Sequence, residues 1–303
     1  MKGVKKLKHF WALYLLMLPG LAYLIINNYI PMTGIIIAFK KYNVNYGIYR
    51  SPWNGLNNFK FLVSNDLSLI LRNTILYNLV FIVLGLVASV SLAIMISDIV
   101  NPTAKKVYQS FVMMPFLISM VIVSYIVFAF MSGDNGLVNK TFREPFNLPK
   151  ITWYSYPKPW PFILTFVHLW KGAGYGTLIY IAGIAGIDKE LYEAARIDGA
   201  SRWRQIRAIT LPHLIPSMIT LTMLAIGRIF YSDFGLFYQV PQNSGALFSV
   251  TQTIDTYVYR ALIQVGGIGK SAAAGFFQSI VGFLFVMGSN LLVRKISPDN
   301  AMF

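Results

Sequence analysis

The sequence predicts an all-α, polytopic membrane protein with six transmembrane helices, and three observations support this fold class. The 303 residues are 56% apolar and only 12% charged, a balance typical of membrane proteins. Long stretches without Lys, Arg, Asp or Glu recur along the chain, and a stretch of about 20 helical residues suffices to cross a bilayer core. The charges fall mostly between these stretches, as they do in the loops of membrane proteins.

Six uncharged or nearly uncharged stretches give the predicted spans, and Lys171 is the charge that interrupts one of them. The first stretch is too long for a signal peptide and lacks a small-residue cleavage site at the right place, so we expect a retained helix. We also expect a short helix that begins near residues 64–66, before the second span. The predicted spans are His9–Phe39, Asn73–Ser97, Val107–Gly133, Pro159–Ile187, Ala208–Gly227 and Ser271–Val293.

Six spans place both termini on the same side of the membrane. Lys and Arg are about twofold denser in the terminal segments and in the second and fourth loops than in the other loops, which favours cytoplasmic termini. The chain is accordingly divided into an N-terminal cytoplasmic segment with the first span and an extracellular loop (1–70), a transmembrane core (71–295) and a C-terminal cytoplasmic tail (296–303).

Residues 188–212 form a charged, helix-forming island between the fourth and fifth spans. Asp188 suits a helix N-cap, and Gly199 suits the left-handed residue that ends a helix. A second short helix is expected to carry Trp203 on an apolar face, with Pro212 opening the next span. This knob is suited to docking in a cleft. An ordinary amphipathic helix lying on the inner leaflet is the alternative that the residues leave open.

The motif Glu193-Ala194-Ala195, followed by Asp198-Gly199-Ala200 and then by Leu211-Pro212, resembles the EAA loop of ATP-binding-cassette importer permeases. The spacing matches throughout, and the resemblance covers roughly residues 71–295. Leu191-Tyr192 and Trp170-Lys171-Gly172 resemble the carbohydrate-uptake branch, the maltose-type permeases of oligosaccharides and polysaccharides. The resemblance implies a type I importer permease fold in a bacterial plasma membrane.

The EAA loop of such permeases docks in a groove on a cytoplasmic ATPase subunit, so the resemblance implies that this knob couples ATP-driven closure to the pore. It also implies the partners: a second homologous permease that forms a heterodimer with this chain, two ATP-binding subunits, an extracellular solute-binding protein and a carbohydrate. ATP and Mg²⁺ are expected on the ATPases, with no cofactor on this chain. The expected coupling residues are Glu193, Ala194, Ala195, Asp198, Gly199, Ala200 and Trp203.

No catalytic or metal-binding pattern is recognisable in the sequence. Gly269-Lys270-Ser271 ends like a phosphate-binding loop, but Gln264 stands where that loop needs a glycine. The three histidines share no ligand spacing, and there are no cysteines. Dispersed charges also argue against nucleic-acid binding. We expect a transport subunit rather than an enzyme. An ion-coupled secondary transporter is the alternative, which calls for inverted repeats and mid-span carboxylates.

The substrate path is expected near the fourth and fifth spans. A lysine inside a span usually faces a cavity or a partner, although Lys171 could also snorkel to the interface. Asp233 could pair with Arg228 or Lys171. Aromatic faces suit sugar rings, and two cations near one path would suit an acidic saccharide. The candidate path residues are His168, Trp170, Lys171, Tyr175, Arg228, Tyr231 and Asp233.

Overall fold

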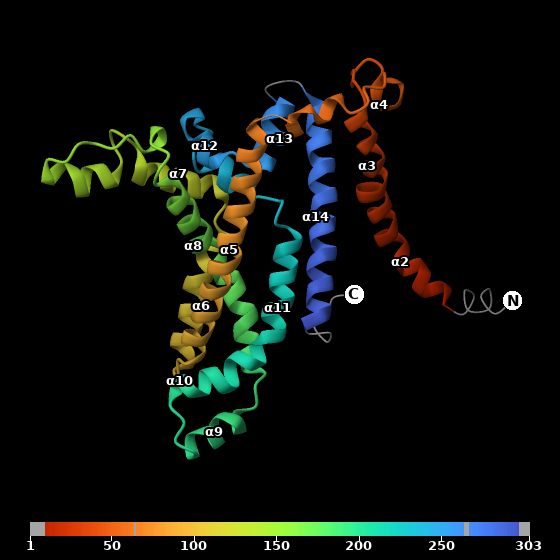
Figure 1. Ribbon diagram of the computed structural model, residues 1–303. Helices are drawn as coiled ribbons and strands as arrows, with labels where there is room; N and C mark the ends of the chain where they lie inside the picture. Colours follow the sequence, from red (N-terminus) through yellow and green to blue (C-terminus); the bar gives the residue numbers. More distant parts are fainter. Residues whose placement is uncertain (1–9, 64, 264–266, 297–303) are drawn as a thin grey trace. The chain divides into compact units, whose positions relative to one another are not determined.

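A computed structural model describes residues 10–63, 65–263 and 267–296. Within these ranges every regular element is helical, and one antiparallel bridge joins Lys40 and Trp53. The prediction of an all-α protein is therefore confirmed. The chain divides into two units, residues 1–64 with 258–277 and residues 65–257 with 278–303 (Figure 1). The first nine residues and residues 297–303 of the expected cytoplasmic tail lie outside the described residues.

The first unit begins with a long helical stretch that matches the first predicted span. Helix α2 (Trp11–Leu24) continues through a π-helical segment, η1 (Ile25–Tyr29), and α3 (Ile30–Met32) into a 3₁₀ segment, η2 (Thr33–Phe39). Nearly all its side chains are exposed, as expected for a helix surrounded by lipid or by another chain.

The loop that follows η2 folds around the side chain of Asn58. Its amide nitrogen donates to the carbonyls of Ala38 at 2.8 Å and Lys40 at 2.9 Å. The ring of Phe39 stacks on Trp53, with 5.9 Å between the ring centroids. Two short helices, α4 (Gly47–Arg50) and η3 (Asn57–Val63), complete this loop. These contacts satisfy backbone groups that would otherwise lack partners at the end of η2.

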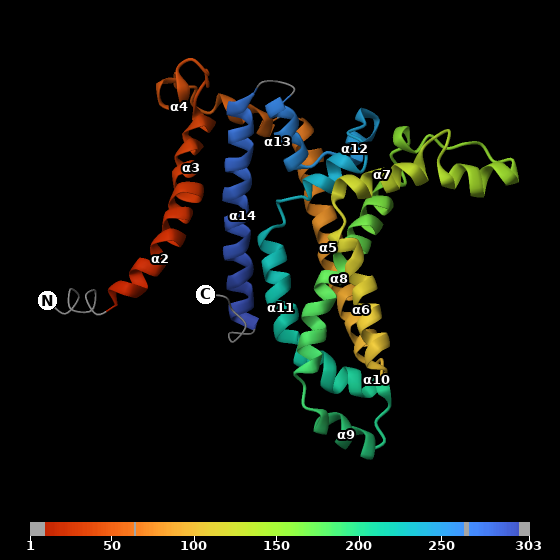
Figure 2. The same ribbon diagram turned by 180° about the vertical axis from the view of Figure 1, so that it is seen from behind.

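The second unit is built on α5 (Asn65–Ser97) and α8 (Trp160–Ala185), which pack along each other (Figures 1 and 2). The separate short helix expected near 64–66 is wrong, because the helix that begins at Asn65 runs without a break into the second span. A side chain at Gly176 would meet Ser89 of α5, so the missing Cβ permits the close approach of these helices.

Buried side chains form two clusters in this unit. One joins the first half of α5 to the start of α8 and to the segment after α11, and the other joins the second half of α5 to the end of α8 and to α11. The first contains Tyr77, Phe81, Val123, Trp160, Leu164, Val167, Leu236, Phe237, Val240 and Leu247, and the second contains Val90, Ala93, Ile96, Tyr180, Ile181 and Leu214.

The third predicted span is broken rather than straight. Helices α6 (Pro102–Leu117) and α7 (Met120–Met131) meet at an angle of 93°. Ile118 and Ser119 between them are extended, with ψ of 133° and 149°. Pro115 lies in the last turn of α6, and the Ser119 hydroxyl caps α7 by accepting from the amide of Ile122. The uninterrupted helix that Val107–Gly133 predicted is therefore wrong.

The second helix of the island is also longer than predicted. After α9 (Lys189–Ile197), helix α10 (Arg202–Gln205) continues through a π-helical segment, η7 (Ile206–Thr210), into α11 (Leu211–Gly227). Pro212 therefore lies inside a continuous helix rather than opening a span. Helix α10 is therefore joined to the fifth span without an intervening loop, and η7 is a place where such a helix can change direction.

Shorter helices lie between the long ones and close the second unit. They are η4 (Asn139–Arg143), η5 (Glu144–Phe146) and η6 (Trp153–Ser155) before α8, and η8 (Gly235–Gln239), η9 (Gly245–Leu247), α12 (Phe248–Thr251) and α13 (Ile254–Ile263) after α11; α14 (Ile268–Ile296) is the last helix described.

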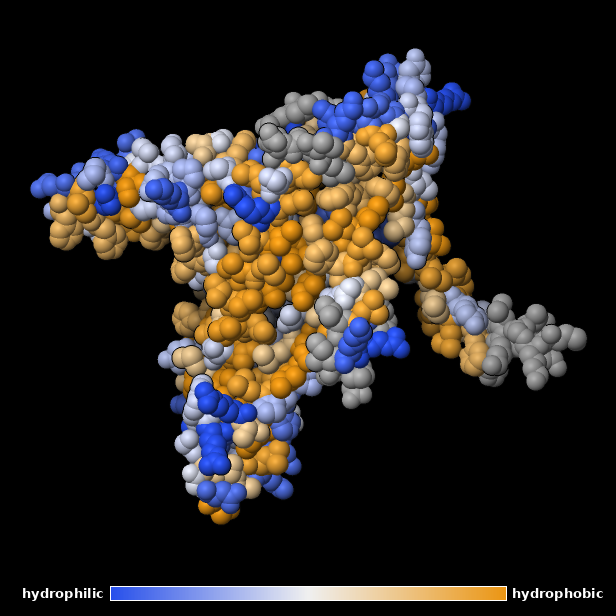
Figure 3. Space-filling view, in the orientation of Figure 1, coloured by the Kyte–Doolittle hydropathy of each residue, from blue (hydrophilic) through white to orange (hydrophobic). Residues whose placement is uncertain are grey.

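Four helices within the described residues are long and apolar enough to cross a membrane, or five if the bent pair α6–α7 is one span. The four are Trp11–Phe39, Leu67–Ser97, Arg202–Gly227 and Ile268–Lys295. Apolar side chains cover the broad visible face of the helices (Figure 3). Helix α8 is not one of the four candidate spans, because Lys171, His168 and several glycines lower its hydropathy. It nevertheless packs along α5. The total of six stays a prediction.

Candidate coupling site and substrate path

Helix α9 forms an exposed knob at one end of the second unit, as Figures 1 and 2 both show. The side chain of Asp188 accepts a hydrogen bond from the amide of Glu190 at 3.0 Å, which confirms the predicted N-cap. None of the nine residues of α9 is buried. Most of its side chains are exposed, so the helix has surface available to a partner.

A left-handed glycine ends α9, as predicted. Gly199 has φ of +74°, and the amide of Ala200 donates to the carbonyl of Ala195 at 2.8 Å. This hydrogen bond closes the C-terminus of the helix. Glycine adopts the left-handed conformation that it needs with little steric cost, because it has no Cβ. The Ser201 hydroxyl then caps α10 by accepting from the amide of Arg204, so the turn between the two helices is fixed at both ends.

The predicted coupling residues share this knob and are mostly exposed. Ala195 and Ala200 are half-buried, whereas Glu193, Ala194, Asp198 and Gly199 are exposed. Trp203 is 59% exposed, and the Arg207 guanidinium lies 4.7 Å from the centre of its ring.

Sequence reasoning missed Ile197, the most exposed apolar side chain of the knob at 88%. It lies between the two halves of the motif, directly before Asp198. The signal that could have found it is an isolated isoleucine on the charged face of a short helix, because such a side chain gains stability only when another surface covers it.

Two side-chain contacts tie the knob to the membrane helices. Arg202 forms an ion pair with Asp98 at the end of α5, in which its Nε donates to Asp98 Oδ2 at 2.9 Å. The hydroxyls of Tyr192 and Thr210 lie 2.9 Å apart. A polar pocket of about 300 Å³ lies behind α9, with Asp98, Lys105, Lys189, Glu193 and Arg202 among its lining residues. The knob is therefore linked to the end of α5 through Arg202 of α10 and to the start of the fifth span through Tyr192 of α9.

Lys171 finds hydrogen-bond partners in the backbone of the third span. Its ammonium group donates to the carbonyls of Ile118 at 2.6 Å and Phe116 at 2.9 Å, at the break between α6 and α7. It also lies 5.6 Å from the centre of the Phe116 ring. A cation at a helix C-terminus satisfies carbonyls that have no amide partner. Lys171 thus holds the bend of the third span.

The other path residues on α8 lie in aromatic contacts. The His168 ring stacks on Phe81 with centroids 3.8 Å apart, and the Tyr175 ring stacks on Phe116 at 5.0 Å. Trp170 is partly exposed and lines a small apolar pocket against α7. His168, Lys171 and Tyr175 are spaced three and four residues apart on α8, and all three side chains contact protein groups.

The region after α11 forms a polar network that the sequence did not predict. Asp255 accepts hydrogen bonds from the Ser232 amide at 2.6 Å and the Ser232 hydroxyl at 2.7 Å. Gln278 of α14 donates to the Phe230 carbonyl at 2.6 Å and reaches Asp255 at 3.3 Å. These bonds fasten the end of α11 to α13 and α14. The spacing along the chain gave no signal, because the partners are about twenty and fifty residues apart.

Three candidate path residues follow the end of α11 at Gly227, namely Arg228, Tyr231 and Asp233. The predicted pairing of Asp233 with Arg228 or Lys171 is wrong. Its Oδ1 accepts from the amide of Leu236 at 3.1 Å, which caps η8. Among the described residues, no ion pair joins Asp233 to Arg228 or Lys171. Tyr231 is 42% exposed and its hydroxyl lies 3.5 Å from Ser279, so its ring remains available as an apolar face.

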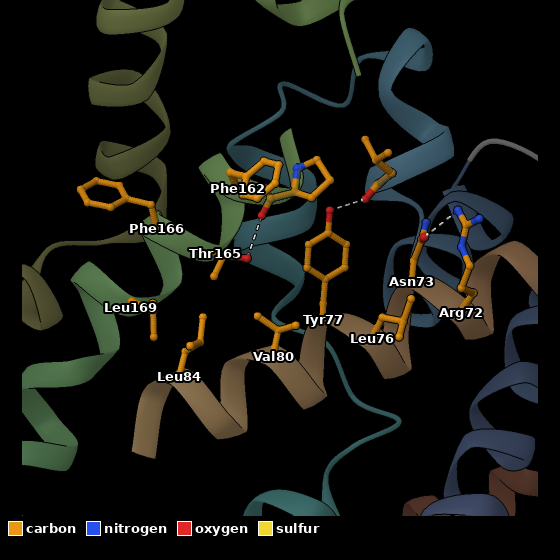
Figure 4. Close-up of a pocket in the computed structure, with 12 residues that line it drawn as sticks. Arg72, Asn73, Leu76, Tyr77, Val80, Leu84, Phe162, Thr165, Phe166 and Leu169 are labelled. Atoms are coloured by element: carbon orange, nitrogen blue, oxygen red, sulfur yellow. Dashed lines mark hydrogen bonds between the residues drawn. The ribbon is translucent and has the colours of Figure 1, made fainter. Parts of the chain in front are cut away.

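Another pocket of the second unit, with a volume of about 560 Å³, lies elsewhere. Side chains of α5, among them Leu76, Tyr77 and Val80, form one wall, and Phe162 and Phe166 of α8 form another (Figure 4). Its lining is nearly all apolar, whereas a sugar needs fixed hydrogen-bond partners, and it contains no predicted path residue. This pocket is therefore a poor candidate for the saccharide.

Long apolar helices, a broken span and an exposed knob tied to two membrane helices define a helical membrane transport protein with a docking element at one end. The chain belongs to the family described as the binding-protein-dependent transport system inner membrane component, whose model matches residues 82–298. It is a permease subunit of an ATP-binding-cassette importer, and its relatives carry out transport rather than an enzymatic reaction. The expected type I permease fold is confirmed.

Relatives from one bacterium are similar over almost the whole chain. Protein LplB of Bacillus subtilis is 34% identical over 293 residues, which cover 95% of this chain and 90% of LplB. The polygalacturonan/rhamnogalacturonan transport system permease protein YteP of Bacillus subtilis is 33% identical over 288 residues, covering 95% and 89%.

The solved structures include a close match. A chain of a bacterial ABC transporter involved in the import of the acidic polysaccharide alginate superposes with a TM-score of 0.88 and is 30% identical, covering 98% of this chain and all of that one. Both the fold and the family therefore follow from similarity over the full length.

Proposed function

We propose that this chain forms half of the pore of an ATP-driven importer of oligosaccharides or polysaccharide fragments. A second, homologous permease supplies the other half, and an extracellular solute-binding protein delivers the sugar. The EAA-like knob and both termini lie in the cytoplasm, as the distribution of Lys and Arg favours. The family description, which names binding-protein-dependent transport, supports the need for a delivery protein.

The knob itself carries the coupling part of the proposal. Helix α9 has no buried residue, and both Ile197 of α9 and Trp203 of α10 are exposed. Arg202 of α10 ties the knob to Asp98 at the end of α5. Two ATP-binding subunits, one for each permease, dock on such knobs and hold ATP and Mg²⁺. ATP shifts the pore between conformations only through the different affinity of the ATPases for them, so the contact between knob and ATPase must be firm.

The substrate is an acidic saccharide. This rests on relatives whose names specify polygalacturonan or rhamnogalacturonan and on a structural neighbour that imports alginate. Of the two cations expected near the path, Lys171 donates to backbone carbonyls and gives this proposal little support. Arg228 and the exposed face of Tyr231 are the path residues that still suit contact with a charged sugar.

Uptake by the reconstituted importer tests substrate and energy source together. The chain is assembled with its cognate permease, ATPases and binding protein in proteoliposomes loaded with ATP. We expect ATP-dependent uptake of a labelled oligogalacturonate above that of a neutral oligosaccharide of equal length. Preference for the neutral sugar would contradict the proposal that the substrate is an acidic saccharide. Uptake driven by an ion gradient without ATP would restore the secondary-transporter alternative, for which neither fold nor relatives give support.

The docking role is tested separately by a charged substitution on the knob. Ile197→Asp should release the ATPases during purification and abolish uptake, because a carboxylate would be desolvated in the contact. Val44→Asp, at an exposed valine of the loop after the first span, is the matched control and should leave the complex intact. Normal assembly and uptake of the Ile197→Asp variant would contradict docking through this knob.

A further inference from the structure

The segment between α7 and α8 forms an arm that projects from the second unit (Figures 1 and 2). Residues 137–146 run outward as a helical stretch that ends in η4 and η5. Asn147, with a left-handed φ of +54°, reverses the chain, and residues 148–152 return without regular structure. Asparagine is one of the few residues that adopt this conformation readily, so the tip is a defined turn.

Hydrogen bonds inside the arm hold it in its extended form. The buried side chain of Asn139 donates to the carbonyls of Gly133 at 2.8 Å and Ile151 at 2.9 Å, and it accepts from the Ile151 amide at 3.2 Å. Nearer the tip, Arg143 Nε donates to the Pro149 carbonyl at 2.7 Å. The outgoing and returning chains are thus joined at two levels, and the arm is a built feature rather than a loose loop.

The arm is amphipathic. Phe142 is 63% exposed and Phe146 is 72% exposed, and the two lie four residues apart on one side of the helical stretch. In Figure 3 the apolar colour gathers along the underside of the arm, on the side towards which the long helices of this unit run, and the hydrophilic colour lies above. The charged side chains of residues 132–159 are the basic Lys140, Arg143, Lys150 and Lys158 and the acidic Asp134 and Glu144.

The place of the arm along the chain brings it to the membrane surface. α7 ends at Met131 directly before it, and α8 begins at Trp160 directly after it. It therefore starts and finishes at the ends of helices in the transmembrane core, at the end of the unit opposite to α9 (Figures 1 and 2). A segment with an apolar underside and a basic upper side at this level matches the pattern of interfacial membrane anchors.

We propose that the arm lies in the headgroup region of the bilayer, with Phe142 and Phe146 inserted among acyl chains and its basic side chains bound to anionic phospholipids. The assignment to the outer leaflet rests on the proposed orientation, whereas the lipid contact does not. Aromatic rings are favoured at this depth. The excess of basic over acidic side chains is complementary to anionic headgroups, which adds an electrostatic attraction.

The base of the arm links this anchor to another loop at the same end. The Ser244 hydroxyl donates to the Tyr154 carbonyl at 2.8 Å, and the Tyr154 hydroxyl donates to the Val240 carbonyl at 3.4 Å. Burial raises the pKa of Tyr154 to about 12, so the phenol stays protonated as a donor. A lipid-bound arm would therefore hold the loop around Val240 and Ser244 at a fixed height relative to the bilayer.

Site-specific fluorescence tests the lipid contact directly. The chain contains no cysteine, so single cysteines can be introduced and labelled with an environment-sensitive dye. The variants are Phe142→Cys and Phe146→Cys, with Lys140→Cys as the matched control on the exposed basic side. Each is assembled with cysteine-free partner subunits in nanodiscs that contain phosphatidylglycerol, and quenching by a shallow spin-labelled lipid is compared with quenching by aqueous iodide.

We expect the labels at 142 and 146 to be quenched several-fold more by the lipid and several-fold less by iodide than the label at 140. Equal access of all three labels to iodide would overturn the proposal. Protection of 142 and 146 that appears only when binding protein is added would also overturn it, since that protein would then be the occupant. Equal protection in lipid-free amphipol would overturn it too, because the second permease would cover the rings.

Discussion

Replacement of Lys171 by methionine should loosen the bend between α6 and α7. The ammonium group makes two short hydrogen bonds to the carbonyls of Phe116 and Ile118. Hydrogen bonds from a charged donor contribute about 1.5–3 kcal/mol each, or roughly 3–6 kcal/mol for the pair. Methionine avoids the cost of placing a cation in the membrane, about 2.5–3.5 kcal/mol. The midpoints leave a net local destabilisation of about 1–2 kcal/mol.

Hydrogen exchange of the backbone amides measures this loss at the bend itself. A destabilisation of about 1–2 kcal/mol raises the open population about 5–30-fold, so the amides of residues 116–123 should exchange faster by that factor in the Lys171→Met variant. Lys171→Arg keeps a charged donor and should stay within a few-fold of the parent. Lys106→Met removes an exposed charge from the other end of α6 and should change nothing at the bend.

Two outcomes would refute this reasoning. If exchange at the bend is unchanged in the Lys171→Met variant, the carbonyls find other donors and the lysine is dispensable there. If Lys106→Met accelerates exchange equally, the effect comes from lost charge in general rather than from the contact with Phe116 and Ile118.

Three further predictions concern the knob and the helix packing. Gly199→Val forces a left-handed φ on a β-branched residue, a cost of at least about 1–2 kcal/mol, and should uncouple ATPase activity from uptake. Gly199→Asn should retain more coupling, because asparagine tolerates a positive φ. A Cβ at this position meets nothing within 4 Å in this chain. Equal loss of coupling in both variants would therefore show that the added side chain disturbs the contact with the ATPase rather than the backbone. Arg202→Ala breaks a partly exposed pair worth about 0–1 kcal/mol, so thermal stability should hardly change while uptake per ATP falls; unchanged uptake would exclude a mechanical role for the pair. A leucine at position 174 would overlap the Val112 backbone, so Gly174→Leu should destabilise the complex by about 1–3 kcal/mol in thermal unfolding. Gly172→Leu is the control, because a side chain there meets nothing within 4 Å. Equal shifts of the unfolding temperature in both variants would count against close packing at Gly174.

Much of the knob could be predicted because its determinants are local. Asp188 caps α9 by accepting from the amide two residues later, and a glycine suits position 199 because φ is positive there. Both effects involve neighbours within a few residues, so the motif alone indicates them. Its role in docking stays a prediction, because no contact of this chain with an ATPase is part of the structure.

The contacts of Lys171, a candidate path residue, could not be predicted because its partners are distant in sequence. The ammonium of Lys171 bonds to carbonyls more than fifty residues earlier, and sequence periodicity does not show that α6 ends beside it. The pairing of Asp233 failed for a different, local reason, because its carboxylate accepts from the amide of Leu236, only three residues away.

Composition and the spacing of uncharged stretches determined that this protein is an all-α membrane protein, because a bilayer admits long apolar helices and excludes unpaired backbone groups. The motif around Gly199 determined its family. Tertiary structure alone decided that the third span bends, that α10 continues into α11, and that Lys171 binds the bend. These features depend on which carbonyls and side chains meet across helices, and that meeting is set by packing rather than by any local pattern.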